Sequence, residues 1–186
     1  EFDYHDYKIN ILDTPGHRDF AEDTCRTLTA VDSVVIVIDS AKGVETQTRR
    51  LMQVCRMRKT PVMVFVNKMD REGKDPFDLM DEVESELGIH VRPLSWPINS
   101  GERFKGVYNI YEKSLNLFQA SKQVVAEKVE VDINTEALDQ HIGAPLADKL
   151  RSELELIDGV YPEFEVADYL QGSLAPVFFG SALNNF

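Results

Sequence analysis

The chain has 186 residues, of which 43% are hydrophobic, so it can bury the core of one α/β domain with an insertion. Its net charge of −12 argues against non-specific binding to DNA or other nucleic acid, which depends on cationic side chains. The sequence has neither an apolar run long enough to span a membrane nor the basic and apolar start of a signal peptide, so we expect a cytoplasmic protein without a membrane partner.

The first part of the chain alternates between two patterns. Apolar, mostly β-branched runs predict buried strands, and the stretches between and after them predict helices, the last of which stops at Gly88. This alternation predicts an α/β fold with a doubly wound, mostly parallel sheet, which binds ligands at the carboxyl ends of its strands. The predicted strands are 7–12, 33–38 and 61–66, and the predicted helices are 22–30, 45–58 and 76–87.

The pattern changes after about residue 94. Residues 104–110 and 114–119 predict a β-hairpin, and 145–156 and 162–171 predict helices, before an apolar strand returns at 175–180. The sequence therefore predicts a small α+β insertion before the last core strand. We expect a core at 1–98, an insertion at 99–172 and a return to the core at 173–186.

The first motif, Asp13-Thr14-Pro15-Gly16-His17, follows the first predicted strand. An aspartate there can hold the shell of a nucleotide-bound Mg²⁺ through water, and Gly16 lets a backbone N–H approach a terminal phosphate closely. His17 is then placed to orient an attacking water, which makes it the candidate catalytic residue. The alternative is a plain turn, shaped by Pro15 and Gly16 and capped by Asp13.

The second motif, Asn67-Lys68-Met69-Asp70, follows the third predicted strand. The Asp70 carboxylate can accept two parallel hydrogen bonds, from N1–H and the exocyclic amine of guanine, a pair of donors that adenine lacks. The methylenes of Lys68 can cover the ring, and Asn67 can tie the loop to neighbouring segments. A surface turn at the end of a strand is the alternative.

The third motif is Ser181-Ala182-Leu183, after Gly180 and the last predicted strand. Small residues let backbone N–H groups reach the oxygen of the base. Alone, the motif is better explained as an ordinary strand-to-helix turn with Ser181 as N-cap. Because all three motifs occur in this order, each after a predicted strand, we expect one guanine-nucleotide site formed by them.

The sequence resembles the translational GTPases, in which the position of His17 carries histidine rather than the glutamine of Ras-like relatives. Within that group it is similar to the bacterial peptide chain release factor 3 family over nearly its whole length. The likeness to translational GTPases as a group continues through Asp19-Phe20, 39–44 and Gln47-Thr48. The segments that resemble release factor 3 are 22–32, Asp75-Pro76, 79–83, 95–98, 104–108 and 176–186.

The resemblance implies a P-loop NTPase-like fold and a GTP hydrolase that binds GTP or GDP with Mg²⁺. It further implies a role in translation termination, where the factor docks on the ribosome and promotes departure of class I release factors. In that family the histidine matching His17 positions the hydrolytic water when the sarcin-ricin loop of the ribosomal RNA approaches. An elongation factor G-like GTPase and a non-catalytic interaction module remain as alternatives.

The sequence Gly-x-x-x-x-Gly-Lys-[Ser/Thr], which holds the β- and γ-phosphates in such enzymes, does not occur in these residues. The family places it upstream of Asp13, together with the first switch segment. We therefore expect this chain to be a fragment that alone neither binds GTP tightly nor hydrolyses it, because positioning and charge stabilisation supply nearly all of phosphoryl-transfer catalysis.

Overall fold

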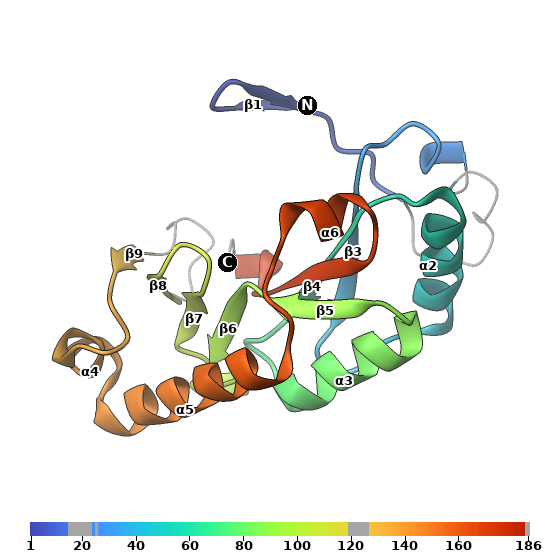
Figure 1. The fold of residues 1–186 in the computed structure, drawn as a ribbon. Coiled ribbons are helices and arrows are strands. Elements are labelled where there is room, and N and C mark those ends of the chain that lie inside the picture. Colours follow the sequence, from blue (N-terminus) through green and yellow to red (C-terminus); the bar gives the residue numbers. More distant parts are fainter. Residues whose placement is uncertain (15–23, 25, 119–126, 185–186) are drawn as a thin grey trace.

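The computed structural model describes residues 1–14, 24, 26–118 and 127–184, and its main sheet is parallel (Figure 1). The strands of this sheet pair in the order β3-β4-β10-β5, and every pairing is parallel. Strands and helices alternate along the chain as predicted, which confirms the α/β fold class. The bounds are β3 (Val34–Asp39), β4 (Val62–Asn67), β5 (His90–Pro93) and β10 (Leu174–Phe179).

Helices α2 (Thr46–Arg58) and α3 (Pro76–Leu87) connect these strands and lie next to each other (Figure 1). Helix α3 has the bounds that the sequence predicts. It begins where the Asp75 side chain accepts a hydrogen bond from the N–H of Phe77 at 2.8 Å, and it ends at Gly88, whose φ of 58° suits a residue without a side chain. None of the described helices is long and apolar enough to cross a membrane.

The two faces of β3 differ in burial. Ile36 and Ile38 are buried, whereas Val35 and Val37 on the opposite face are 57% and 59% exposed. The apolar run predicts a strand covered on both faces, and for β3 this prediction is wrong. The strand is an edge of the main sheet, and it buries one side only.

The prediction of a core strand at 7–12, leading to Asp13, is also wrong. Strand β2 (Tyr7–Ile9) pairs antiparallel with β1 (Phe2–Tyr4) in a hairpin that stands apart from the main sheet (Figure 1). Its neighbours Ile11 and Leu12 are 67% and 52% exposed. The segment has a partner close in sequence, so its backbone groups are satisfied without joining the main sheet.

A second, antiparallel sheet pairs in the order β6-β7-β8-β9. It contains the predicted hairpin, and it begins at Ser95, four residues before the expected insertion. The division into 1–98, 99–172 and 173–186 stays a prediction. The strands are β6 (Ser95–Ile98), β7 (Gly106–Asn109), β8 (Ser114–Leu117) and β9 (Glu127–Glu130), and the helices that follow are α4 (Glu136–Ile142), α5 (Ala144–Val160) and α6 (Val166–Leu170).

Helix α5 joins the second sheet to the main sheet. The Arg92 guanidinium of β5 contacts the Asp158 carboxylate at 2.6 Å, and the indole N–H of Trp96 in β6 donates to Glu153 at 2.9 Å. The apolar side of α5 is buried in the same core as the main sheet. The two sheets therefore form one packed body, held by a core that crosses between them.

The predicted helix 22–30 and one of the two cysteines fall partly or wholly outside the described residues. Of the predicted helix 22–30, the described part is a helical turn in which the Leu28 N–H donates to the Thr24 carbonyl at 2.9 Å. Of the two cysteines, Cys55 is a free thiol and fully buried, and burial raises its pKa. Cys25 lies outside the described residues.

Candidate functional site

The second and third motifs meet at the end of the main sheet where the parallel strands have their carboxyl ends. Strands β4 and β10 are parallel neighbours, so the residues that follow them leave the sheet side by side. The Gly180 N–H donates to the Val66 carbonyl at 2.9 Å, and the Met69 N–H donates to the Gly180 carbonyl at 3.1 Å. Met69 itself is fully buried beneath the two loops. The structure thus brings together two stretches that are more than a hundred residues apart in the sequence.

The Asp70 carboxylate is held in place by the third motif. Ser181 Oγ contacts Asp70 Oδ1 at 2.6 Å, and Asn184 Nδ2 donates to Asp70 Oδ2 at 3.2 Å. Asn184 also donates to Ser181 Oγ at 2.9 Å, which closes a small network around the carboxylate. An ionised carboxylate offers about four acceptor positions, so each oxygen of Asp70 retains capacity for one more donor.

Asn67 ties the two loops together through its side-chain oxygen. This Oδ1 accepts the N–H of Lys68 at 2.8 Å and the N–H of Ala182 at 2.9 Å. The N–H of Ala182, which the sequence predicts to face a base oxygen, is therefore paired with Asn67 in this structure. Leu183 follows directly in a 3-10 turn, and its side chain is 58% exposed.

Lys68 is fixed by a partner that the sequence analysis missed. Its Nζ lies 2.6 Å from Oδ2 of Asp39, and its backbone is left-handed with a φ of 69°. The hydrogen bond from Lys68 holds the pKa of Asp39 below its usual value, against the effect of burial. Ser40 Oγ also donates to the Lys68 carbonyl at 3.1 Å.

Asp39 and Ser40 lie at the carboxyl end of β3, and Asp39 is the pairing partner of Asn67 at the carboxyl end of β4. The rule that ligands bind at the carboxyl ends of parallel strands was the signal that could have identified them as site residues. Asn184, the third residue missed, carried no comparable signal in the sequence.

The first motif is described only at its start. Asp13 is exposed and Thr14 is half-buried, in the extended segment after β2, while Pro15, Gly16 and His17 lie outside the described residues. Among the described residues, no hydrogen bond or ion pair joins Asp13 or Thr14 to the other two motifs. The convergence of all three motifs therefore stays a prediction for this first one.

An Mg²⁺ ion that accompanies a nucleotide keeps several waters and needs only one or two protein oxygens. The described residues contain no cluster of three or more His, Cys, Asp or Glu that could hold a metal by themselves. Asp13 offers an exposed carboxylate without an ion-pair partner in the described part of the chain, so its chemistry fits contact with such an ion through water.

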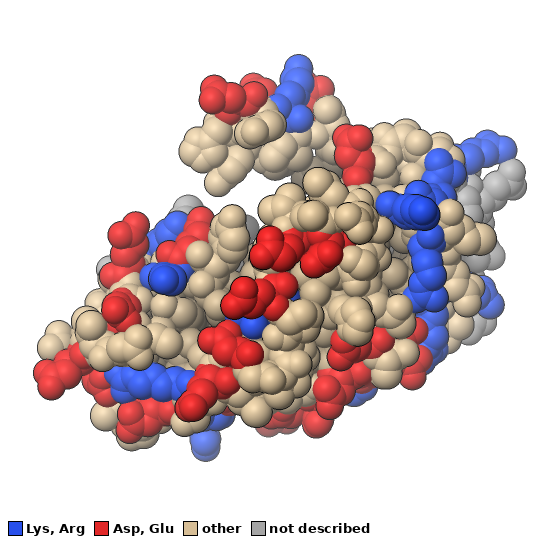
Figure 2. Space-filling view, viewed as in Figure 1, with Lys and Arg blue, Asp and Glu red and all other residues tan. Residues whose placement is uncertain are grey.

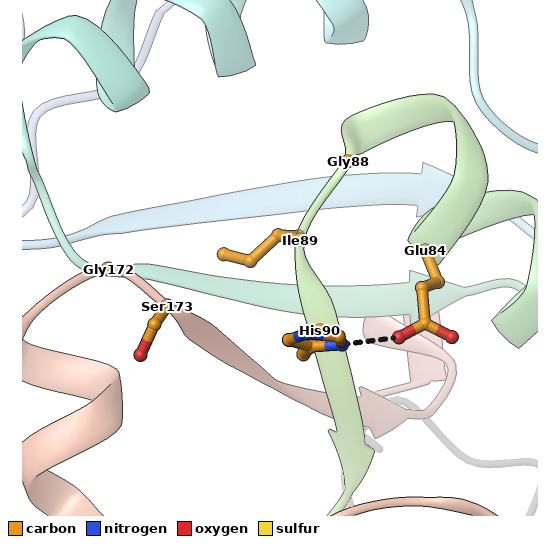
Figure 3. A pocket seen from close by; sticks show the side chains of 6 residues that line it. All are labelled: Glu84, Gly88, Ile89, His90, Gly172 and Ser173. Atoms are coloured by element: carbon orange, nitrogen blue, oxygen red, sulfur yellow. Dashed lines mark hydrogen bonds and ion pairs between the residues drawn. The ribbon is translucent and has the colours of Figure 1, made fainter.

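A pocket lies at the other end of the main sheet, where the strands β5 and β10 begin. His90 is the first residue of β5 and Ser173 directly precedes β10, so the pocket sits where these strands start, not where they end. Figure 3 shows its lining, with His90 Nδ1 facing the Glu84 carboxylate at 3.1 Å. Because it lies at the opposite end of the strands, this pocket is separate from the candidate site at Asn67–Asp70 and Ser181–Leu183.

Charged side chains gather unevenly on the surface, with Lys and Arg over α2 and many Asp and Glu elsewhere on the same face (Figure 2). Two arginines of α2 bind groups of α3 in the same chain. Arg49 forms an ion pair with Glu86 of α3, and Arg56 donates to the Leu87 carbonyl. These two residues therefore fasten α2 to α3.

The comparisons with known proteins agree with the parallel α/β fold. A crystal structure from Thermus thermophilus superposes with a TM-score of 0.65 at 21% identity, over 93% of this chain and 27% of that chain. The present chain thus spans about a quarter of that chain's length, and the likeness shows the fold. A family model described as the elongation factor Tu GTP binding domain matches residues 1–186. The chain belongs to the elongation factor Tu GTP-binding domain family.

Proposed function

We propose that this chain is the guanine-reading part of a GTP-hydrolysing translation factor, with Asp70 as the residue that selects the base. The observation that carries the proposal is the position of the Asp70 carboxylate. It is held by Ser181 and Asn184 beside the paired ends of β4 and β10, with one acceptor position left on each oxygen.

Those two positions suit the N1–H and the exocyclic amine of guanine, which point in the same direction on one edge of the ring. Adenine lacks an N–H at N1, so an ATP molecule would leave the two remaining acceptor positions of the Asp70 carboxylate without donors. The oxygen of guanine would accept the N–H of Leu183, or compete with Asn67 for that of Ala182. The Lys68 stem, anchored by Asp39, would cover one face of the ring.

The phosphates would be read by the first motif. Asp13 would hold the nucleotide's Mg²⁺ through water, Gly16 would donate its backbone N–H to the terminal phosphate, and His17 would orient the attacking water. Bound Mg²⁺ supplies neutralisation of the charge on the β- and γ-phosphates. Thr14, Pro15 and Met69 complete the proposed nucleotide-binding set.

The cellular role that we propose is translation termination. The segments Ser95–Ile98 and 104–108 resemble release factor 3 more than elongation factor G. The partners would be the ribosome, including the sarcin-ricin loop, and class I release factors. Hydrolysis would return the factor to its GDP form after these release factors have left.

The test uses the extended protein, by which we mean these residues together with an upstream phosphate-binding loop. We expect competition for a fluorescent GDP by GTP and GDP but not by ATP, and GTP hydrolysis that ribosomes stimulate. His17→Ala should reduce stimulated hydrolysis far more than GTP affinity. Equal competition by ATP would contradict the base assignment, and equal loss of hydrolysis and affinity would make His17 structural.

The 186 residues alone should bind GTP much more weakly than the extended protein does, because they contain no phosphate-binding loop sequence. Calorimetric titration of the chain with GTP measures this directly. Micromolar affinity would show that the described loops suffice for binding, and the proposal for the upstream loop would then be wrong.

A further inference from the structure

The second sheet contacts the end of β10 and the loop after β4, the two segments that carry the third and second motifs. Strand β6 starts at Ser95, whose Oγ accepts the N–H of Phe179 at 2.9 Å. Phe179 is the last residue of β10, directly before Gly180 and Ser181. Both partners are buried, Ser95 at 4% exposure and Phe179 at 3%, so water does not compete for this bond.

The other loop is held by the turn after β6. The N–H of Gly101 donates to the Met69 carbonyl at 2.9 Å, in the residue before Asp70. Gly101 has a φ of 64°, a conformation that costs other residues energy, and its carbonyl accepts the N–H of Phe104 at 3.0 Å. Glycine is therefore favoured at the position that presents this N–H to Met69.

Trp96 fixes the position of β6 between these two contacts. Its ring is fully buried, 4.6 Å from the ring of Phe77 in α3 and 5.4 Å from that of Phe179, measured between centroids. The segment from Ser95 to Gly101 is thus packed against the main sheet and hydrogen-bonded to the end of β10 and to the loop after β4. Met69 receives the bond from Gly101 and donates to Gly180, which links the three segments in one chain of hydrogen bonds.

We propose that Ser95 and Gly101 are positioning residues for guanine recognition, which set the separation between the Asp70 carboxylate and the backbone of Ser181–Leu183. The inference rests on the proposed function and extends it, because it places part of the specificity for guanine in the second sheet. By linkage, a partner that displaces β6 changes guanine affinity, and guanine binding changes the stability of β6 by the same free energy.

The test compares Ser95→Ala with Ser114→Ala in the extended protein. Ser114 is a matched control because it is also buried in the second sheet, and its Oγ has no hydrogen-bond partner among the described residues. The readout is the ratio of the affinities for GDP and for inosine diphosphate, which lacks the exocyclic amine. We expect Ser95→Ala to lower this ratio about fivefold, as loss of one buried hydrogen bond would, and Ser114→Ala to leave it within about twofold.

A lower melting temperature for Ser95→Ala with an unchanged ratio would overturn the inference, because Ser95 would then be structural only. If the wild-type protein itself did not prefer GDP to ADP, the proposed function would fail and this inference with it. If Ser95→Ala does not fold, amide hydrogen exchange of the wild type decides. Saturating GDP should slow exchange at Phe179 and Gly101 and leave Val129 in β9 unchanged, and equal rates with and without GDP would overturn the inference.

Discussion

Glu153 accepts the indole N–H of Trp96 at the junction of the two sheets. Substituting Glu153 by alanine and by glutamine should separate the loss of this acceptor from the loss of the negative charge. Glu153→Ala leaves the fully buried indole N–H without its acceptor, which costs about 1–3 kcal/mol. Since a 1 kcal/mol loss lowers Tm by about 2–4 °C in a chain of this size, we expect a decrease of about 2–12 °C. Glu153→Gln keeps an acceptor oxygen and should lose less than half as much.

The pH dependence gives this prediction a sign. Burial raises the pKa of Glu153, with opposing effects from Trp96 and from Lys149 at 3.7 Å. The folded state therefore holds the proton more tightly than the unfolded state, so the contribution of Glu153 to stability is full below the unfolded pKa and falls as the pH rises through the folded pKa. Glu153→Gln has no such loss, and its stability relative to wild type should increase from pH 4 to pH 7.

The assay is urea unfolding followed by the fluorescence of Trp96, which is the only tryptophan in the sequence. Glu155→Gln, at an exposed position of the same helix, is the control and should change stability by less than about 0.5 kcal/mol. Glu153 would not act as a buried acceptor for Trp96 if Glu153→Gln were as destabilising as Glu153→Ala, or if the stability of Glu153→Gln relative to wild type decreased with rising pH.

Two further predictions concern the main sheet. Asp39→Asn should cost about 0.5–1 kcal/mol at pH 7, because it removes the charge that pairs with the partly exposed Lys68. The folded state lowers the pKa of Asp39, so the difference from wild type should shrink as the pH falls from the unfolded pKa to below the folded pKa, and a difference in urea unfolding that does not shrink over this range would contradict the pairing. Val37→Thr, on the exposed face of β3, should change stability by less than about 0.5 kcal/mol, whereas Val64→Thr in β4 should cost about 1–3 kcal/mol. Urea unfolding measures both. Equal urea midpoints for the two variants would show that the exposed face of β3 is covered in solution.

Much of the fold follows from local signals. The sequence predicts helix α3 to the residue because Asp75, Pro76 and Gly88 mark its two ends chemically. The pairing of the second and third motifs follows from a general property of parallel sheets, since both come directly after apolar strands. In both cases the local sequence favours one structure, because capping residues mark the ends of a helix and loops that follow neighbouring parallel strands meet at the same end of the sheet.

The errors arise where tertiary partners decide the outcome. Residues 7–12 have a strand pattern, but the sequence does not say which strand will pair with them, and β1 is the partner. Strand β6 contains Pro97, which disfavours a strand assignment, and β9 reads Glu-Lys-Val-Glu, without apolar alternation. The Asp39–Lys68 ion pair joins residues from two strand ends, and only the register of β3 on β4 reveals it.

We propose that the Asp70 carboxylate, held by Ser181 and Asn184, reads guanine. Asp70→Asn in the extended protein tests it most directly, because an amide offers one acceptor and one donor, which suit the N1–H and the 2-carbonyl of xanthine. We measure the affinities of wild type and variant for GDP and xanthosine diphosphate. We expect the ratio of these affinities to shift toward xanthosine diphosphate by at least about 100-fold, whereas an equal change in both affinities, or no change, would contradict the role of Asp70.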